Sequence, residues 1–483
     1  MTSQQPRLVV PAGVLDGLRD ALLRADGDER FAFVYCGDHG RRLLASRVVA
    51  PEDDRMAVTE RTACRPDPAF ERECIGACVE EQLAPLLVHS HPFAESPAFS
   101  GRDVARMDDF RGWLTGLYDD PTYGFAVLGQ SDAEAVVDVD GQFADARVEV
   151  LAPWKLDAAL PSAVSRFDPP GRDHADAPDR DADGVAGTYD RNVRAVTEDG
   201  QRRLSSAAVA VVGAGGVGSM VAEQLVRLGV TDLLVVDPDE VETTNLPRTV
   251  GAYDHHVGKP KVDALREHLW KSSPTADGTI ATAHAPVEDV AERLDDYDLV
   301  VGCVDRVSTR SFLNEYAVKH LTYYVDAGVR IDVDGDEGAR TTTAMTGYVQ
   351  LVAPGANACF DCLGRHAPGA SHVERLSPEE RAAERERGYI ADEALAPEPA
   401  VVHLNGVVAS KAVSVVSKLV TGHAAPPDFV RYDDLENDMT ELTTEPSERC
   451  PTCGEDGLRG VGRRSFGSFE TATEDDAPTQ TPQ

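Results

Sequence analysis

Lysine is scarce in this sequence of 483 residues. Only seven lysines are present, so arginine supplies most of the 47 basic side chains, which stand against 83 acidic ones. The formal net charge is therefore −36. A chain with so large an excess of acid offers no broad basic surface to a polyanion. The composition thus argues against binding to DNA, RNA or an anionic membrane.

Long apolar segments are also missing. No stretch approaches the roughly 20 apolar residues that cross a bilayer as a helix, and the first residues, MTSQQPRLVV, do not follow the pattern of a secretory signal. Apolar residues nevertheless make up 42% of the chain, as in globular proteins. We therefore expect a cytoplasmic protein with buried cores and no membrane segment.

Nine cysteines are present, and none lies between Cys362 and Cys450. The last four form two C-x-x-C pairs, Cys359 with Cys362 and Cys450 with Cys453. In a reducing compartment, such pairs indicate metal binding rather than disulfides. Two pairs predict a closed, tetrahedral, structural zinc site with four thiolates. A redox disulfide is the alternative, which we disfavour because there are two pairs and each lies in a loop.

The length of the chain favours two to four domains. Residues 1–162 form a first domain with helical and strand-like segments, and residues 163–188, rich in Pro, Gly and Asp, predict an acidic linker. Residues 189–454 form a second domain, whose polar segment 366–398 predicts a crossover loop. Residues 455–483 predict a disordered tail.

Buried strands alternate with helices in the second domain. AAVAVVG leads through a glycine-rich turn into the helical SMVAEQLVRLG, and LLVVDPDE, DLVVGCVD and YYVDAGV follow as further strands. This alternation predicts an α/β fold with a doubly wound, mostly parallel sheet. The first domain predicts an α+β fold, because the helical VLDGLRDALLRA precedes the strands ERFAFVYCG and LAPLLVHSH.

A candidate metal site lies in the first domain. His89 and His91 are two residues apart at the end of an apolar strand, so both side chains point to the same side and can share one ion. Asp103, at the start of the next predicted helix, can supply a third ligand and leave a fourth position open, which is the arrangement of a catalytic zinc. The alternatives are ordinary surface histidines and a capping box formed by Ser100 and Asp103.

The succession of H-x-H-P and S-x-x-D resembles the signature of the JAMM (MPN-type) zinc metalloproteases. The resemblance implies His89, His91 and Asp103 as zinc ligands and Ser100 as the group that stabilises the oxyanion. The family also places a glutamate at the start of the first strand as general base, and Glu29 occupies that place directly before RFAFVYCG. The other candidates for the base, in less suitable contexts, are Glu60, Glu71, Glu73 and Glu80.

A nucleotide-binding turn opens the second domain. A G-x-G-x-x-G motif lies between a strand and a helix, where glycines permit a tight turn and close approach of a phosphate to the helix N-terminus. The glycines expected to bind the nucleotide are Gly213, Gly215, Gly216 and Gly218. Asp237 closes the next strand, where an acid accepts the ribose hydroxyls. A nicotinamide dehydrogenase would share these features.

Further polar residues favour triphosphate chemistry over hydride transfer. Asp239 and Asn245 follow the ribose-binding acid, and the cations Arg248 and Lys261 can neutralise a triphosphate during attack at its α-phosphorus. Either cation could instead be an ordinary solvated side chain. Asp305 comes at the end of a later strand, where a carboxylate can hold Mg²⁺.

This order of motifs, from Tyr189 to Gly454, is similar to that of the ThiF/MoeB adenylyltransferases and of the related ubiquitin-activating enzymes. The resemblance implies ATP and Mg²⁺ as cofactors, Asp237 at the ribose and Asp305 at the magnesium. It places Asn245, Arg248 and Lys261 at the phosphates, and the four paired cysteines at the family's structural zinc. Tyr189-Asp190-Arg191 resembles the leading motif of the family, in which the arginine reaches the ATP of the partner subunit, so Arg191 implies a homodimer.

Together, the two resemblances imply a protein that acts on a small ubiquitin-like protein ending in Gly-Gly. The second domain would adenylate its C-terminal carboxylate, and the first would hydrolyse the bond that follows this glycine. Activating enzymes that transfer their substrate as a thioester carry a cysteine in the crossover region, which this chain lacks, so the predicted reaction ends at the acyl-adenylate. The alternative is a tRNA-modifying or sulfur-transfer adenylyltransferase with an inactive, scaffolding first domain. The acid-rich, lysine-poor composition resembles that of proteins from salt-loving archaea.

Overall fold

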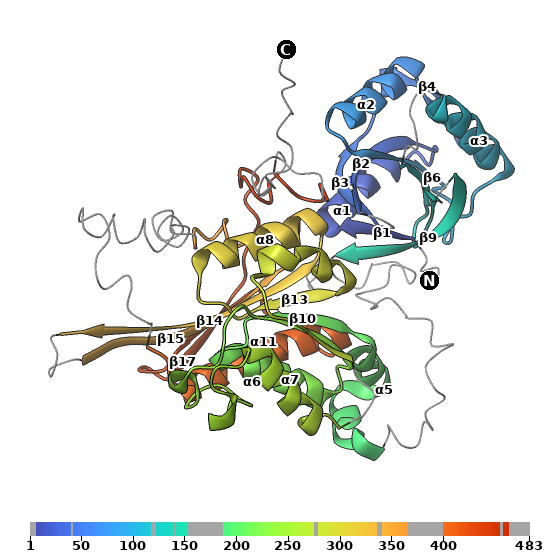
Figure 1. The fold of residues 1–483 in the computed structure, drawn as a ribbon. Helices are drawn as coiled ribbons and strands as arrows, with labels where there is room; N and C mark the ends of the chain where they lie inside the picture. Colours follow the sequence, from blue (N-terminus) through green and yellow to red (C-terminus); the bar gives the residue numbers. More distant parts are fainter. Residues whose placement is uncertain are drawn as a thin grey trace, which may run out of the picture.

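Two separate sheets organise the chain (Figure 1). The structure is a computed structural model, and it describes residues 6–39, 42–116, 122–139, 141–151, 187–274, 279–335, 341–365, 399–454 and 457–462. Three predicted segments lie outside the described residues: the linker up to residue 186, the crossover loop 366–398, and the tail beyond residue 462.

The first sheet closes into a barrel in the order β1-β3-β2-β6-β7-β8-β9, and the parallel pairing of β1 with β9 completes the ring. Its strands are β1 (Arg7–Pro11), β2 (Phe31–His39), β3 (Arg42–Val49), β6 (Ala84–Ser90), β7 (Gly124–Leu128), β8 (Ala133–Val139) and β9 (Gln142–Leu151). The other elements of this domain are α1 (Ala12–Leu22), η1 (Asp53–Arg55), the hairpin of β4 (Met56–Glu60) with β5 (Ala63–Pro66), α2 (Pro68–Glu80) and α3 (Gly101–Thr115).

Alternation along β2 explains how the helices pack on this barrel. Ala32 and Val34 belong to a core that includes the apolar side chains of α1. Phe31 and Phe33 point the other way and join a second core with residues of α2 and α3. Successive side chains of a strand face opposite sides, so the continuous apolar run of β2 is buried on both faces. The predicted α+β arrangement of helices and strands in this domain is therefore confirmed.

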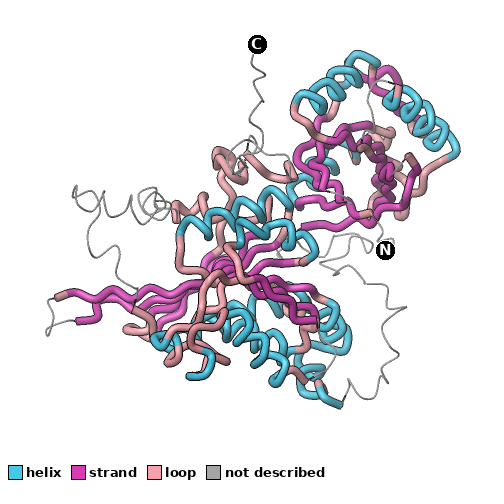
Figure 2. Tube along the Cα trace, in the orientation of Figure 1, coloured by secondary structure: helices cyan, strands magenta, loops and turns pink. Residues whose placement is uncertain are grey.

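The second sheet has eight strands in the order β12-β11-β10-β13-β14-β15-β16-β17. They are β10 (Ala208–Val212), β11 (Asp232–Val236), β12 (Thr279–Ala283), β13 (Leu299–Gly302), β14 (Tyr323–Asp334), β15 (Thr341–Val352), β16 (Phe429–Asp433) and β17 (Asp438–Leu442). The strands from β12 to β14 are parallel, whereas those from β14 to β17 are joined by antiparallel pairs. The predicted α/β fold is confirmed, with an antiparallel extension at one edge that Figure 2 shows as a long ribbon.

Helices cover both faces of this sheet (Figure 1). α8 (Val307–His320) lies on one face, and α5 (Asp190–Ser206), α6 (Gly216–Leu228), α7 (Lys261–Ser272) and α11 (Val402–Thr421) lie on the other. The described part of this domain also contains the 3₁₀ segments η2 (Thr243–Asn245), η3 (Asp254–His256) and η4 (Val287–Asp296). Of the described helices, α11 alone is long and apolar enough to span a membrane, but 67% of its apolar window is buried inside the protein. It is a core helix, packed on α6 and on the sheet.

The two domains meet where α8 ends. The Gly460 amide donates to the Val318 carbonyl over 3.0 Å, and the Ser46 hydroxyl donates to the Arg459 carbonyl over 2.7 Å. Residues 457–462 thus lie between β3 and the end of α8. We expected these residues to belong to a disordered tail, and the structure instead packs Gly460 and the two residues after it in buried positions.

Candidate functional site

The glycine turn follows β10 and leads into α6. Gly213 has a φ of 98°, and a Cβ on it would lie 2.6 Å from the carbonyl oxygen of Cys303, so this position requires glycine. A Cβ on Gly218 would lie 1.8 Å from the carbonyl oxygen of Gly213, which closes the turn just as tightly. At Gly215, the N-cap of α6, a Cβ would meet nothing described within 4 Å. The turn is therefore tight on its protein side and open where a ligand can approach the helix N-terminus.

Asp237 holds this turn from the end of β11. Its Oδ2 accepts a hydrogen bond from the Ala214 amide over 2.6 Å, and its Oδ1 accepts one from the Asp239 amide over 2.8 Å. The side chain is 5% exposed, and burial raises its pKa. Lys261, at the start of α7, donates to Asp239 over 2.7 Å. The structure thus brings together three of the residues predicted to bind ATP.

The other predicted nucleotide-binding residues surround the same strand ends. Asn245 is buried, and its Oδ1 caps η2 by accepting from the Glu242 amide over 3.0 Å. A Cβ on Gly216 would lie 3.3 Å from the carbonyl oxygen of Arg248, which places this segment beside the turn. Asp305 is exposed, two residues after the cysteine whose carbonyl contacts the turn.

Arg191, the last of the predicted nucleotide-binding residues, belongs to a different element, the helix α5. It lies in the first turn of α5, and its side chain is exposed. Its predicted role in the ATP site of a second subunit remains a prediction.

One residue of this site was not found from the sequence. Asn405 lies in the first turn of α11, is 2% exposed, and reaches the glycine turn: a Cβ on Gly216 would lie 2.2 Å from its Nδ2. Its Oδ1 is buried and has no hydrogen-bond partner among the described residues. The only signal in the sequence is an asparagine within the otherwise apolar start of a helix. The atom beside the turn is Nδ2, a donor that suits an oxygen of a bound phosphate.

A buried ion pair supports the strand end that carries Asp305. Arg310 of α8 binds both the Asp326 carboxylate on β14 and the Val304 carbonyl. Arg365 approaches the second oxygen of Asp326 at 2.9 Å. Asp326 is fully buried, so these two cations compensate its charge. The network fixes the backbone directly before Asp305.

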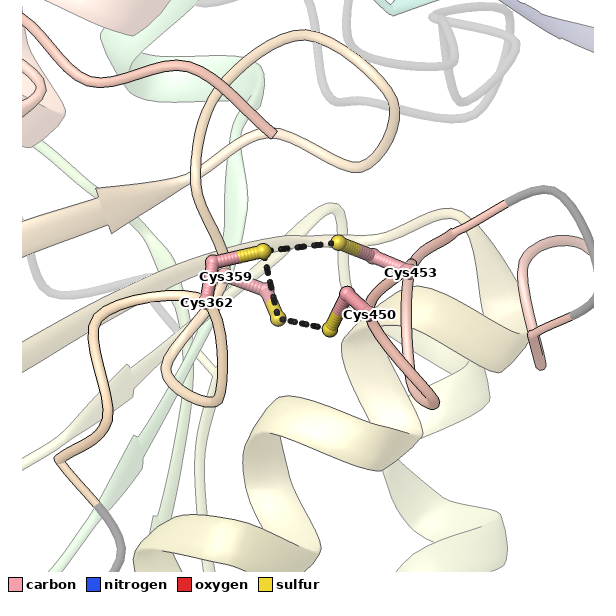
Figure 3. Close-up of side chains that lie close together, drawn as sticks. All are labelled: Cys359, Cys362, Cys450 and Cys453. Atoms are coloured by element: carbon pink, nitrogen blue, oxygen red, sulfur yellow. Dashed lines mark hydrogen bonds between the residues drawn. The ribbon is translucent and has the colours of Figure 1, made fainter. Parts of the chain in front are cut away.

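The four paired cysteines form one cluster (Figure 3). Cys359 Sγ lies 3.8 Å from Cys362 Sγ and 3.6 Å from Cys450 Sγ, and Cys362 Sγ lies 3.3 Å from Cys453 Sγ. Ligands at 2.3 Å from a tetrahedral zinc ion are about 3.8 Å apart. Burial raises the pKa of the Cys362 thiol to about 11. The four sulfurs fit a structural zinc ion.

The two cysteine pairs are held by α8. Asn314 accepts a hydrogen bond from the Phe360 amide over 2.9 Å, and Thr452 of the second pair donates to Asp361 of the first. Because Asn314 is fully buried, it fixes the first cysteine loop relative to the core.

In the first domain, the predicted metal ligands converge. The Nε2 atoms of His89 and His91 are 3.2 Å apart, at the end of β6. Asp103 places Oδ1 3.3 Å from His89 Nε2 and Oδ2 3.7 Å from His91 Nε2. Two imidazole nitrogens and a carboxylate oxygen within 4.8 Å of one another make a donor set that suits zinc.

Asp103 also belongs to a capping box, so both interpretations of the S-x-x-D motif hold. The Ser100 amide donates to Asp103 Oδ2 over 2.6 Å, and the Asp103 amide donates to Ser100 Oγ over 3.3 Å. Although burial opposes the shift, hydrogen bonds from His89 and Ser100 lower the pKa of Asp103. The cap therefore orients the carboxylate and keeps it ionised, as a metal ligand must be.

Glu29 lies beside these side chains. Arg30 and Ser90 exchange hydrogen bonds of 3.0 Å, which set Glu29 next to the end of β6. Its Oε1 is 3.7 Å from His91 Nε2, and burial raises its pKa. The alternatives Glu71 and Glu73 are instead held by Arg106 and Arg55.

A cleft of about 880 Å³ opens over this site. Glu29, both histidines, Ser100 and Asp103 line it, and residues 62–65 around the turn of the β4–β5 hairpin form its opposite wall. The raised pKa of Glu29 makes it easier for this carboxylate to take up a proton. Together with the three metal-ligating side chains beside it in the cleft, it forms an arrangement suited to hydrolysis.

The fold and the site of the second domain define a nucleotide-binding α/β protein of the doubly wound class with a tetracysteine cluster. Residues 189–452, more than half of the chain, match the ThiF family, and the chain belongs to that family. It is 31% identical over 267 residues to the sulfur carrier protein adenylyltransferase of Thermus thermophilus, covering 54% of this chain and 87% of that protein.

Similarity extends to a eukaryotic relative and to a solved structure. The ubiquitin-like modifier-activating enzyme 5 of Drosophila willistoni is 28% identical over 263 residues, covering 51% of this chain and 58% of that protein. The similarity to the crystal structure of E. coli MccB with ATP covers 55% of this chain and 74% of that chain, at 20% identity and a TM-score of 0.45.

Proposed function

We propose that the second domain adenylates the C-terminal carboxylate of a small ubiquitin-like or sulfur carrier protein. A carboxylate oxygen attacks the α-phosphorus of ATP, the bond to the β-phosphate oxygen breaks, and an acyl-adenylate and pyrophosphate result. Membership of the ThiF family supports this proposal, as does the similarity to a sulfur carrier protein adenylyltransferase of Thermus and a ubiquitin-like modifier-activating enzyme of Drosophila. The observation that carries it is the glycine turn, which is open at Gly215 and meets three strand ends.

Each predicted residue has a role in this proposal. Asp237 would accept the ribose hydroxyls, and Asn245, Arg248 and Lys261 would bind the phosphates. Lys261 is paired with Asp239 in the unliganded protein, so it would change partners when a triphosphate binds. Asp305 would hold Mg²⁺, which neutralises phosphate charge when bound.

A homodimer belongs to the same proposal. Arg191 is exposed in the first turn of α5, where it is free to reach the ATP of a second copy. The partner substrate would end in Gly-Gly, as the resemblance to the ubiquitin-activating enzymes implies.

The fate of the acyl-adenylate depends on the missing cysteine. No cysteine occurs between Cys362 and Cys450, so a thioester on the crossover segment is not part of the proposal. Attack of a sulfide-level donor on the acyl carbon would give a thiocarboxylate and release AMP, and the similarity to the sulfur carrier protein adenylyltransferase of Thermus favours this outcome. Attack by a lysine amine of another protein would give a conjugate.

We further propose that the first domain is a zinc-dependent isopeptidase that cleaves after the C-terminal glycine of the same substrate. His89, His91 and Asp103 would hold the zinc, which supplies Lewis acidity to water and to the scissile carbonyl when bound. Glu29 would accept the proton of the attacking water and pass it to the leaving amine, and Ser100 would donate a hydrogen bond to the oxyanion. Such cleavage produces the free carboxylate that the second domain uses.

ATP–pyrophosphate exchange tests the adenylation. The purified chain is mixed with candidate ubiquitin-like and sulfur carrier proteins, and exchange is expected with at least one of them. Lys261→Ala should abolish exchange, whereas Lys271→Ala, at the exposed end of the same helix, should not. Absence of exchange with every candidate contradicts the proposal.

A linear fusion of the same substrate to a reporter protein tests the cleavage. The chain should release the reporter, and Glu29→Gln should not, while exchange stays unchanged in that variant. Cleavage that persists in Glu29→Gln would exclude Glu29 as the base.

A further inference from the structure

A second group of metal-ligating side chains lies at the contact between the two domains, away from both candidate sites. It consists of His39, the last residue of β2, Asp295 near the end of η4, and His320, the last residue of α8. One residue comes from the first domain and two from the second. Ligand atoms of all three lie within 4.8 Å of one another.

Both imidazole rings are buried and incompletely bonded. His39 and His320 are each 7% exposed, and the Nδ1 atom of each is buried without a hydrogen-bond partner among the described residues. His39 Nε2 lies 2.9 Å from Asp295 Oδ1, and the two rings are 4.5 Å apart at an angle of 65°. The single contact with Asp295 leaves a second nitrogen on His39 unsatisfied, and buried polar atoms in this state call for an unseen partner.

The surroundings favour a cation. Tyr316 donates to Asp295 Oδ1 over 2.7 Å and stacks on the ring of His320, so it orients two of the three side chains as an outer ligand shell does. His320 is at the C-terminal end of α8, where the helix dipole is negative.

Two cations, Arg42 and Lys319, are close by, and Lys319 is paired with Glu315 over 2.6 Å. Arg42 donates to the backbone carbonyl of His320 over 3.2 Å, so it lies at the backbone and not at the ring.

We propose that His39, Asp295 and His320 bind a divalent zinc-like cation that joins the two domains. The donor set of two nitrogens and one carboxylate oxygen suits zinc, with a fourth position for water. Bonds of about 2.0–2.1 Å place tetrahedral ligands about 3.4 Å apart. The 2.9 Å contact with Asp295 and a ligand spread below 4.8 Å meet this after small side-chain rotations.

Metal content of the full-length chain, loaded with Zn²⁺ alone and then desalted, tests the site. Asp295→Asn and His320→Asn should each contain one equivalent of zinc less than the unaltered chain. Asp295→Asn keeps an oxygen that can accept from His39 and Tyr316, so its fold should be maintained. Asp296→Asn, an exposed neighbour, should retain the full content. Equal zinc in all four proteins, with unchanged circular dichroism, would overturn the proposal.

Anomalous scattering at the zinc edge gives a second measurement on the unaltered chain, which does not depend on the folding of any variant. A peak between His39, Asp295 and His320 is expected. A crystal soaked in Zn²⁺ with no peak there would equally overturn the proposal.

Discussion

Replacing two glycines of the same turn separates its structural role from its binding role. Gly218→Ala puts a Cβ 1.8 Å from the Gly213 carbonyl oxygen, whereas real Cβ contacts do not fall below 3.0 Å. The oxygen must therefore retreat by about 1.2 Å (3.0 minus 1.8), which displaces the backbone between β10 and α6. Overpacking of this kind costs about 1–3 kcal/mol. At about 2–4 °C per kcal/mol, Tm should fall by several degrees.

Gly215→Ala should instead lower ATP affinity and leave Tm nearly unchanged. At this position φ is −81° and ψ is −155°, which alanine can adopt, and nothing described lies within 4 Å of a Cβ. The loss of glycine at the N-cap of α6 costs about 0.5–1 kcal/mol at most. The new methyl group instead fills the space that a phosphate needs to approach the helix N-terminus. ATP affinity should fall at least about tenfold, which is 1.4 kcal/mol.

Differential scanning fluorimetry and calorimetric titration with MgATP read out the two effects. Gly218→Ala should lower both Tm and affinity, and Gly215→Ala should lower affinity with little change in Tm. Gly101→Ala, at another glycine with open space for a Cβ, is the control and should change neither. Unaltered ATP affinity in Gly215→Ala would refute the assignment of this turn as the phosphate site.

Three further outcomes follow from individual side chains. Cys359→Ser should remove one equivalent of zinc and lower Tm, measured by elemental analysis and calorimetry; retention of zinc would exclude the cysteine site. Asn405→Ala should weaken ATP binding several-fold at unchanged KM for the protein substrate, because its donor Nδ2 lies beside the turn; equal affinity would leave Asn405 a purely structural residue. Burial raises the pKa of Asp298 to about 7, so between about pH 4 and 7 the folded state holds a proton that the unfolded state has lost, and stability falls as pH rises, by up to about 1.4 kcal/mol per unit. Urea unfolding of Asp298→Asn should lack this contribution, and curves parallel to those of the unaltered chain would refute it.

Features that reside in short sequence patterns could be predicted. The glycine turn is set by four neighbouring glycines between a strand and a helix, and each cysteine pair spans four residues. The alternation of side chains on a strand was enough to predict that His89 and His91 lie side by side, and their Nε2 atoms are 3.2 Å apart. Glu29 was predicted as the base because the resemblance calls for a glutamate at the start of the first strand, and the structure places this side chain 3.7 Å from His91.

Features that depend on the packing of distant segments could not be predicted. Asn405 contacts a turn almost 190 residues away in the sequence, and nothing in its local pattern distinguishes it from a core asparagine. Residues 457–462 belong to the segment predicted as a disordered tail, yet Gly460 and Gly462 have φ of 70° and 69° and pass close to the backbone of β2 and β3. There glycine serves close approach, which composition does not reveal.

The remaining question is whether the two domains act independently, and α8 is the element that decides it. The helix follows Asp305 closely, holds the first cysteine loop through Asn314 and ends at His320 in the domain contact. α8 contacts the Asp305 strand end, the cysteine cluster and the domain contact, so a displacement of the helix at one of these places can be transmitted to the others. We therefore expect Cys359→Ser to speed hydrogen exchange of the Gly460 amide, which donates to α8 at Val318, although the two lie in different parts of the sequence. Unchanged exchange at Gly460, with zinc verifiably lost from the cysteine cluster, would show that the helix does not couple the domains.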